Sequence, residues 1–170
     1  IAWMMTMVLA VIPTGISQSL LSEGSHQPEK LAQLARKSIF MALGLSFAGI
    51  IFITVTGGWL LGFFGSDYSQ EGTAIARLLA ISVIPQCINS LFMTVNQVKK
   101  RMNLILIQTG ALSTIALGIG FWMLNKIGPQ GVATAYVMAH GTVALFAIRP
   151  MWNLINEKIF IQNLRKDPIP

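Results

Sequence analysis

Residues 82–101 read SVIPQCINSLFMTVNQVKKR, an apolar stretch that carries several amides and hydroxyls and ends in three cations. The uncharged part of this stretch belongs to a run from residue 78 to residue 98, which is long enough for a helix to cross a hydrocarbon core of about 30 Å. A simple membrane anchor needs no amides in its middle, so one side of this helix is expected to face something other than lipid. Charged groups are costly inside hydrocarbon, which explains why the cations stand at the end of the run.

Four further runs without Asp, Glu, Lys or Arg accompany this one, at residues 1–22, 38–66, 102–125 and 127–148. Only 11% of the 170 residues are charged, whereas a soluble domain has about a quarter charged residues. So many apolar runs leave too little chain to cover them with anything but lipid. The sequence therefore predicts an all-α polytopic membrane protein with a transmembrane lobe at residues 1–149, whose five helices lie at about 1–21, 38–58, 73–97, 103–124 and 130–148.

The distribution of cations predicts the orientation of these helices. Of the twelve Lys and Arg residues, all but Arg77 and Lys126 lie between spans one and two, between spans three and four, or after span five. By the positive-inside rule, loops 22–37 and 98–102 and the C-terminus are cytoplasmic, in the cell inner (plasma) membrane. The net charge of +6 then needs no nucleic acid to explain it.

Two short surface helices are expected beside the spans. Pro28 and the residues after it are typical of a helix start, which predicts a short helix along the cytoplasmic surface before span two. Residues 150–170 are predicted to form an interfacial helix and a tail, because their apolar residues gather on one side.

Small residues spaced four apart predict where helices pack closely in lipid. Span two carries Ser38, Ala42 and Ser46 in this spacing, and span five carries Gly131, Ala135 and Ala139. The single cysteine, Cys87, is expected to be a small packing residue within span three.

Span three has a polar side and an aliphatic side. Two interpretations of the polar side are open. Its amides and hydroxyls can join helices, each contributing about 0.6 to 2 kcal/mol, or they can line a water-filled cavity on a substrate pathway. A continuous stripe of this many polar residues is more than helix packing needs, so it favours the interpretation as a water-filled cavity. The residues that share an arc of about 120° on a helical wheel are Ser82, Gln86, Asn89, Ser90, Met93, Asn96 and Gln97.

Ionisable residues add further candidates for the pathway. His140 lies deep in span five, where it either hydrogen-bonds between helices as a neutral imidazole or contacts a substrate or a proton. Arg77, near the outer end of span three, either reaches the headgroups or faces a phosphate. Lys99, Lys100 and Arg101 anchor the topology and are candidates for attracting anionic lipid or pyrophosphate headgroups at the cytoplasmic mouth.

The sequence offers little chemistry for catalysis. All six acidic residues lie in predicted loops, tails or interfaces, and we find no metal-ligand spacing, paired carboxylates or nucleophile motif. We therefore expect a protein that is not an enzyme and that uses no cofactor or metal.

Several segments in order resemble a known family. They are PTGISQSLLSEG (13–24), PEKLAQLARKS (28–38), GGWLLGFFGSDY (57–68), ARLLAISVIPQCINSL (76–91) and IGPQGVATAYVMAH (127–140). Together they resemble the C-terminal lobe of the polysaccharide transporter family, the O-antigen and lipid-linked oligosaccharide flippases. This family shares a superfamily with multidrug and toxic compound extruders and the lipid II flippase.

The resemblance implies two bundles of about six helices around a central cavity, working by alternating access. The substrate would be an undecaprenyl-pyrophosphate-linked sugar of polysaccharide or lipopolysaccharide biosynthesis, moved from the inner to the outer leaflet. The chain begins at Ile1 without an initiator Met, so we interpret it as the C-terminal part of a longer protein. Its partners would be the lipid bilayer, the lipid-linked substrate and an N-terminal lobe. Family members often meet the pyrophosphate with cations in the cavity, a role that only Arg77 could fill within these spans.

Other classes remain alternatives. A cation-coupled multidrug extruder of the same fold usually needs an intramembrane carboxylate, which these spans lack. A non-transporting scaffold would show no shared polar face, and span three argues against it. A polytopic glycosyltransferase or polymerase would need acids or large loops.

Overall fold

A computed structural model describes residues 2–63 and 66–166, with side chains described for residues 3–63 and 72–156. Five long helices form it: α1 (Ala2–His26), α2 (Leu31–Gly62), α3 (Ser66–Val98), α4 (Met102–Ile127) and α5 (Pro129–Lys166). A 3-10 turn, η1 (Pro28–Lys30), stands between α1 and α2. All five helices are long and apolar enough to cross a membrane, which confirms the predicted all-α polytopic fold.

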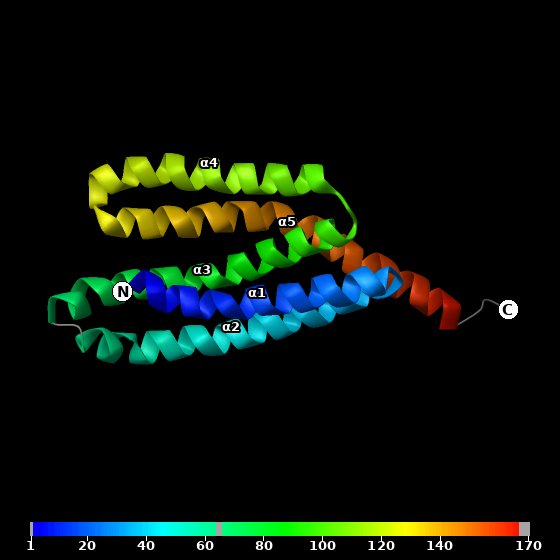
Figure 1. Ribbon diagram of the computed structural model, residues 1–170, viewed down its shortest axis with the longest axis horizontal. Helices are drawn as coiled ribbons and strands as arrows, with labels where there is room; N and C mark the ends of the chain where they lie inside the picture. Colours follow the sequence, from blue (N-terminus) through cyan, green and yellow to red (C-terminus); the bar gives the residue numbers. More distant parts are fainter. Residues whose placement is uncertain (1, 64–65, 167–170) are drawn as a thin grey trace.

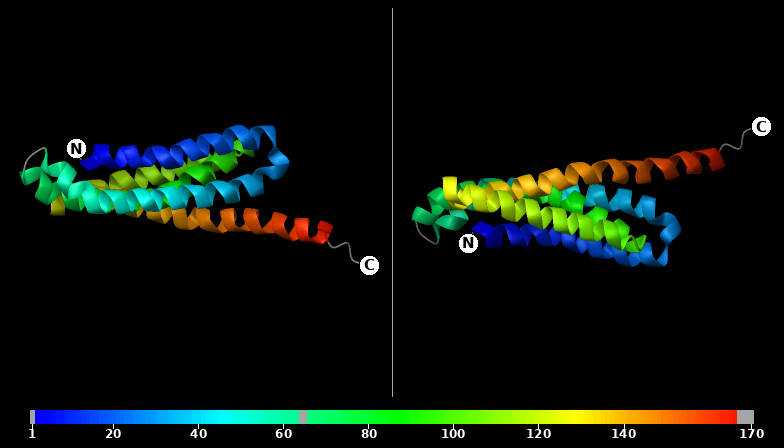
Figure 2. Two further views of the ribbon diagram at one scale, coloured as in Figure 1. Left: turned by 90° about the horizontal axis from the view of Figure 1, so that it is seen from below. Right: turned by 90° about the horizontal axis from the view of Figure 1, so that it is seen from above.

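Consecutive helices run in opposite directions, so the turns gather at two ends (Figure 1). The α1–α2 connection, the α3–α4 turn and the C-terminal part of α5 lie at one end, and the end of α2, the start of α3 and the α4–α5 turn lie at the other. The predicted loop cations, among them Lys30 and Lys99, therefore share one end of the bundle. Figure 2 shows α5 extending past the other helices at that end.

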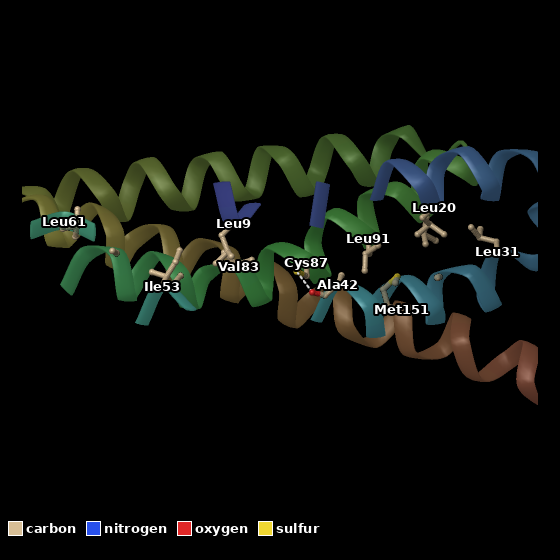
Figure 3. Packing of buried hydrophobic residues seen from close by; sticks show 14 residues of the cluster. Leu9, Leu20, Leu31, Ala42, Ile53, Leu61, Val83, Cys87, Leu91 and Met151 are labelled. Carbon is tan, nitrogen blue, oxygen red and sulfur yellow. Dashed lines mark hydrogen bonds between the residues drawn. The ribbon is translucent and has the colours of Figure 1, made fainter. Parts of the chain in front are cut away.

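The helix α3 is the centre of the bundle and packs against α1, α2 and α5. Its residues Ala80, Val83, Cys87 and Leu91 have no exposed surface. Figure 3 shows Val83, Cys87 and Leu91 among apolar side chains from α1, α2 and α5. The apolar core therefore runs along α3 rather than between two equal layers.

Small residues form the closest helix contacts, as predicted. Ala42 and Ser46 of α2 are fully buried against α3, where the Ser46 hydroxyl lies 3.1 Å from the Cys87 thiol. Figure 3 also marks the Cys87 thiol contact with the Ala42 carbonyl oxygen. In α5, a Cβ added at Gly131 would lie 2.5 Å from the backbone oxygen of Met123 in α4. Only glycine permits this approach. Burial confirms the predicted packing role of Cys87 and of the two small-residue stripes except at Ser38, which is half-buried.

The predicted surface helix before span two is wrong. The chain passes from η1 directly into α2, which runs unbroken from Leu31 to Gly62. No Gly or Pro interrupts residues 31–43, so nothing ends a helix before the span begins. Leu31, Ala32 and Ala35 are buried, and Leu31 lies against Gly24 of α1, so this turn packs on the bundle.

The helix expected after Pro150 is a continuation of α5. The helix runs through Pro150 to Lys166, because a proline in a long helix removes one hydrogen bond without preventing the following turns. Met151, directly after the proline, is buried in the same core as α3. The interfacial position of residues 150–170 stays a prediction, since side chains after residue 156 lie outside the described part.

Candidate polar site within the membrane

A cluster of amide and imidazole groups lies where α3, α4 and α5 meet. It consists of Asn89 from α3, Gln108 from α4 and His140 from α5, and all three residues are buried. The Asn89 amide nitrogen donates to the His140 backbone oxygen at 3.0 Å and lies 3.3 Å from the His140 Nδ1 atom. The Gln108 amide nitrogen donates to the Asn89 backbone oxygen at 2.9 Å. The cluster therefore ties three membrane helices together.

Two oxygens of this cluster have unused hydrogen-bonding capacity. Asn89 Oδ1 and Gln108 Oε1 are buried, and neither has a hydrogen-bond partner within the described chain. An unsatisfied buried acceptor costs about 1–3 kcal/mol, so such an oxygen favours any water or donor group that reaches it. The cluster can thus accept further hydrogen bonds between the membrane-spanning helices.

Aromatic rings extend the cluster toward α1. The ring of Tyr136 lies one helical turn before His140, with 4.5 Å between the two ring centroids. Trp3 of α1 meets Tyr136 edge-on at 5.0 Å. A cavity of about 20 Å³ beside these rings is lined by Gln86 and Thr6 among other residues, and this volume suffices for one water molecule.

The predicted polar stripe of α3 is divided between two settings. Ser82 is fully buried, and its hydroxyl donates to the Leu79 backbone oxygen while it accepts from the Gln86 amide at 3.0 Å. Gln86, Ser90 and Gln97 are half-buried, and the Ser90 hydroxyl donates to the Gln86 backbone oxygen. Only Asn89 reaches across to another helix. The stripe thus contains both interhelical bonds and partly accessible groups, and its place on a substrate pathway stays a prediction.

Arg77 does not join this cluster. It is exposed, and its guanidinium donates to the Thr54 backbone oxygen of α2 at 3.3 Å. Asn89 lies twelve positions after it in α3, which is about 18 Å along a helix.

The basic turn between α3 and α4 lies beside a cavity of about 440 Å³. Lys99 and Arg101 line this cavity, together with Asn96 and Gln108, whereas Lys100 does not. The structure therefore separates the three cations that the sequence placed in one group.

Gln108 and Tyr136 were missed by the sequence reasoning. Gln108 is the one amide in the run LILIQTGAL, and a lone amide in such a run is a signal that one side of span four is covered. Tyr136 precedes His140 by four residues, which places both on one helix face.

No family model and no solved structure matches this chain. The chain is 25% identical over 167 residues to the probable flippase AglR of Haloferax volcanii. The match covers 89% of this chain and 33% of AglR, so the chain spans about a third of that protein's length. It is thus a multi-pass membrane protein with a distant similarity to a flippase.

Proposed function

We propose that this chain forms part of a flippase that moves lipid-linked oligosaccharides across the cell membrane by alternating access. The similarity to the probable flippase AglR along 89% of the chain carries this proposal. A flippase must shelter a hydrated sugar while the lipid tail stays in the bilayer, which requires neutral hydrogen-bonding groups within the spans. The cluster of Asn89, Gln108 and His140 supplies groups of this kind.

We place the substrate pathway beside Gln86, on the side of α3 that approaches Trp3 and Tyr136. Gln86 is half-buried there and lines the small cavity between α1, α3 and α5. Ser82 acts as a positioning residue, because its hydroxyl accepts the hydrogen bond that orients the Gln86 amide. His140 contributes the neutral imidazole of the same region.

The remaining candidates have narrower proposed roles. Ser90 and Gln97 are half-buried, so a movement of the neighbouring helices would bring them to the pathway. Arg77 would meet an anionic group near the end of the bundle where it is exposed. The cationic turns would lie in the cytoplasm, where an undecaprenyl-pyrophosphate-linked sugar of an O-antigen type would enter.

A second helical bundle is part of this proposal. AglR is about three times as long as the segment that this chain matches, which leaves room for another bundle of similar size. The second bundle would complete the cavity and supply further contacts to the pyrophosphate.

Transport in proteoliposomes tests the proposal. The complete gene product is reconstituted with a fluorescent undecaprenyl-pyrophosphate oligosaccharide, and its arrival in the outer leaflet is followed with an external quencher. We expect Gln86→Leu plus Asn89→Leu to slow transfer at least tenfold, because each removes a hydrogen-bonding group from the spans. Thr54→Val, a polar-to-apolar change on the exposed side of α2, should leave the rate unchanged.

The outcomes separate the parts of the proposal. The single variant Gln86→Leu keeps the Asn89–His140 bond, so its transfer rate distinguishes a lost contact from a disturbed bundle. Transfer that is unaffected by both variants would keep the flippase and refute the pathway beside Gln86. No transfer under any ion gradient would refute the flippase itself.

A further inference from the structure

The cavity beside the α3–α4 turn is not needed for the pathway proposed above. It lies between the C-terminal half of α3, the N-terminal half of α4 and the middle of α5. Its volume of about 440 Å³ falls in the range of ligand sites, which is about 300–1,000 Å³. Most of its wall is apolar, with Phe92 and Val95 from α3, Ile107 from α4, and Phe146 from α5.

The end of α3 brings two cations to the rim of this cavity. Lys100 has a φ of 56°, in the left-handed region, and its N–H bonds to the Gln97 oxygen at 2.9 Å. The Arg101 N–H reaches back to the Asn96 oxygen at 2.8 Å, which completes a Schellman-type helix end. This tight reversal leaves Lys99 and Arg101 on the cavity and Lys100 outside its lining.

The wall has few polar groups, although the Gln108 Oε1 atom has no hydrogen-bond partner within the described chain. The Asn96 amide nitrogen donates to the Phe92 backbone oxygen at 2.9 Å, and the Gln108 amide nitrogen donates to the Asn89 backbone oxygen at 2.9 Å. Both amide donors are thus bonded within the bundle. Among the residues whose side chains the structure describes, the lining includes no acidic residue. An apolar wall with two cations at one end matches an apolar chain that ends in an anion.

We propose that this cavity binds an anionic phospholipid from the adjacent leaflet. Its phosphate would lie between Lys99 and Arg101, and one acyl chain would lie against Phe92, Ile107 and Phe146. The cations lie at the end of the spans, at the level of the lipid headgroups. The phosphate can therefore contact them without entering the hydrocarbon core. The bound lipid would fill the space between α4 and α3. Lipid binding at this site would not require the transport pathway proposed above.

Native mass spectrometry of the full-length protein in detergent tests the site, with phosphatidylglycerol as the probe and phosphatidylcholine as the neutral comparison. Each surface cation changes the affinity for anionic lipid by about fivefold, so Lys99→Gln plus Arg101→Gln should weaken phosphatidylglycerol binding by about 25-fold. Lys30→Gln plus Arg36→Gln removes the same charge at the same end, from exposed positions outside the cavity lining. This control pair should change the affinity less than twofold.

A second variant tests the apolar part without changing any charge. Ala111 is half-buried and lines the cavity, so Ala111→Phe should fill the space and weaken phosphatidylglycerol binding at least tenfold. This variant decides the question if the charge variant fails to fold. Equal losses in the two charge pairs, equal binding of phosphatidylcholine, or unchanged binding by Ala111→Phe would each overturn the proposal. Displacement of phosphatidylglycerol by an equimolar polyprenyl pyrophosphate would also overturn it.

Discussion

Two helices of this protein, α3 and α4, have nearly the same hydropathy and opposite surroundings. In the most apolar window of each, half of the α3 residues are buried, but only 6% of the α4 residues are buried. Leu91 of α3 has no exposed surface, whereas Leu117 of α4 is 75% exposed. Hydropathy alone therefore identifies a span but does not say whether protein or lipid surrounds it.

The polar and small residues make the difference. The central helix α3 carries Ser82, Cys87 and Asn89, which are all buried against neighbouring helices. The peripheral helix α4 exposes large apolar residues such as Phe121 and Trp122, and it is attached mainly to α5. In a membrane, small and hydrogen-bonding side chains mark the surface that another helix covers.

The largest expected effect concerns the close approach of α5 to α4 at Gly131. Gly131→Val would push a branched side chain into the Met123 backbone, which has no flexible end that could move aside. We expect a loss of about 3 kcal/mol or more in the free energy of unfolding. The matched change Gly118→Val in α4 adds the same side chain where no atom lies within 4 Å of the new Cβ, and should be nearly neutral. Thermal unfolding in mild detergent measures both.

A similar effect in Gly118→Val would show that another surface covers α4 in the sample, which would remove the contrast between the two helices.

A smaller effect is expected from truncating one leucine in each helix. Leu91→Ala in α3 leaves a cavity in the core and should destabilise the protein by about 2 kcal/mol. Leu117 is largely exposed within the described chain, so the free energy of unfolding of Leu117→Ala should change by less than about 0.5 kcal/mol. Denaturant titration of both variants compares them, and equal losses would contradict the central place of α3.

The smallest expected effect tests the polar cluster. Asn89→Ala removes the bonds to His140 and should cost about 1 kcal/mol, the usual scale for such bonds between membrane helices. Asn103→Ala at the exposed start of α4 provides the matched control, with no expected change in melting temperature. A neutral result for Asn89→Ala would mean that water replaces its bonds, as expected for a hydrated pathway.

Much of the fold follows from the sequence, because uncharged runs of about 20 residues have no stable place outside a membrane. The sequence also identified Asn89 and His140 as candidates, since polar groups in a span need partners. It did not predict that they meet, nor that Gln108 and Tyr136 join them. A helical wheel shows on which side of a helix a residue lies, but it does not show which helix packs against that side. The surface helix near Pro28 was predicted wrongly because a helix-start signal does not show where the helix ends, and no Gly or Pro stands between Pro28 and the start of the span.

The contact between Cys87 and Ser46 has a practical consequence for labelling. The only thiol of this chain is fully buried at the α2–α3 contact, so it should not react with maleimide reagents while the bundle stays folded. A cysteine introduced at an exposed position such as Gly118 can then carry a spin label or fluorophore without first removing the native one. The same thiol, once it reacts, reports that α2 has separated from α3.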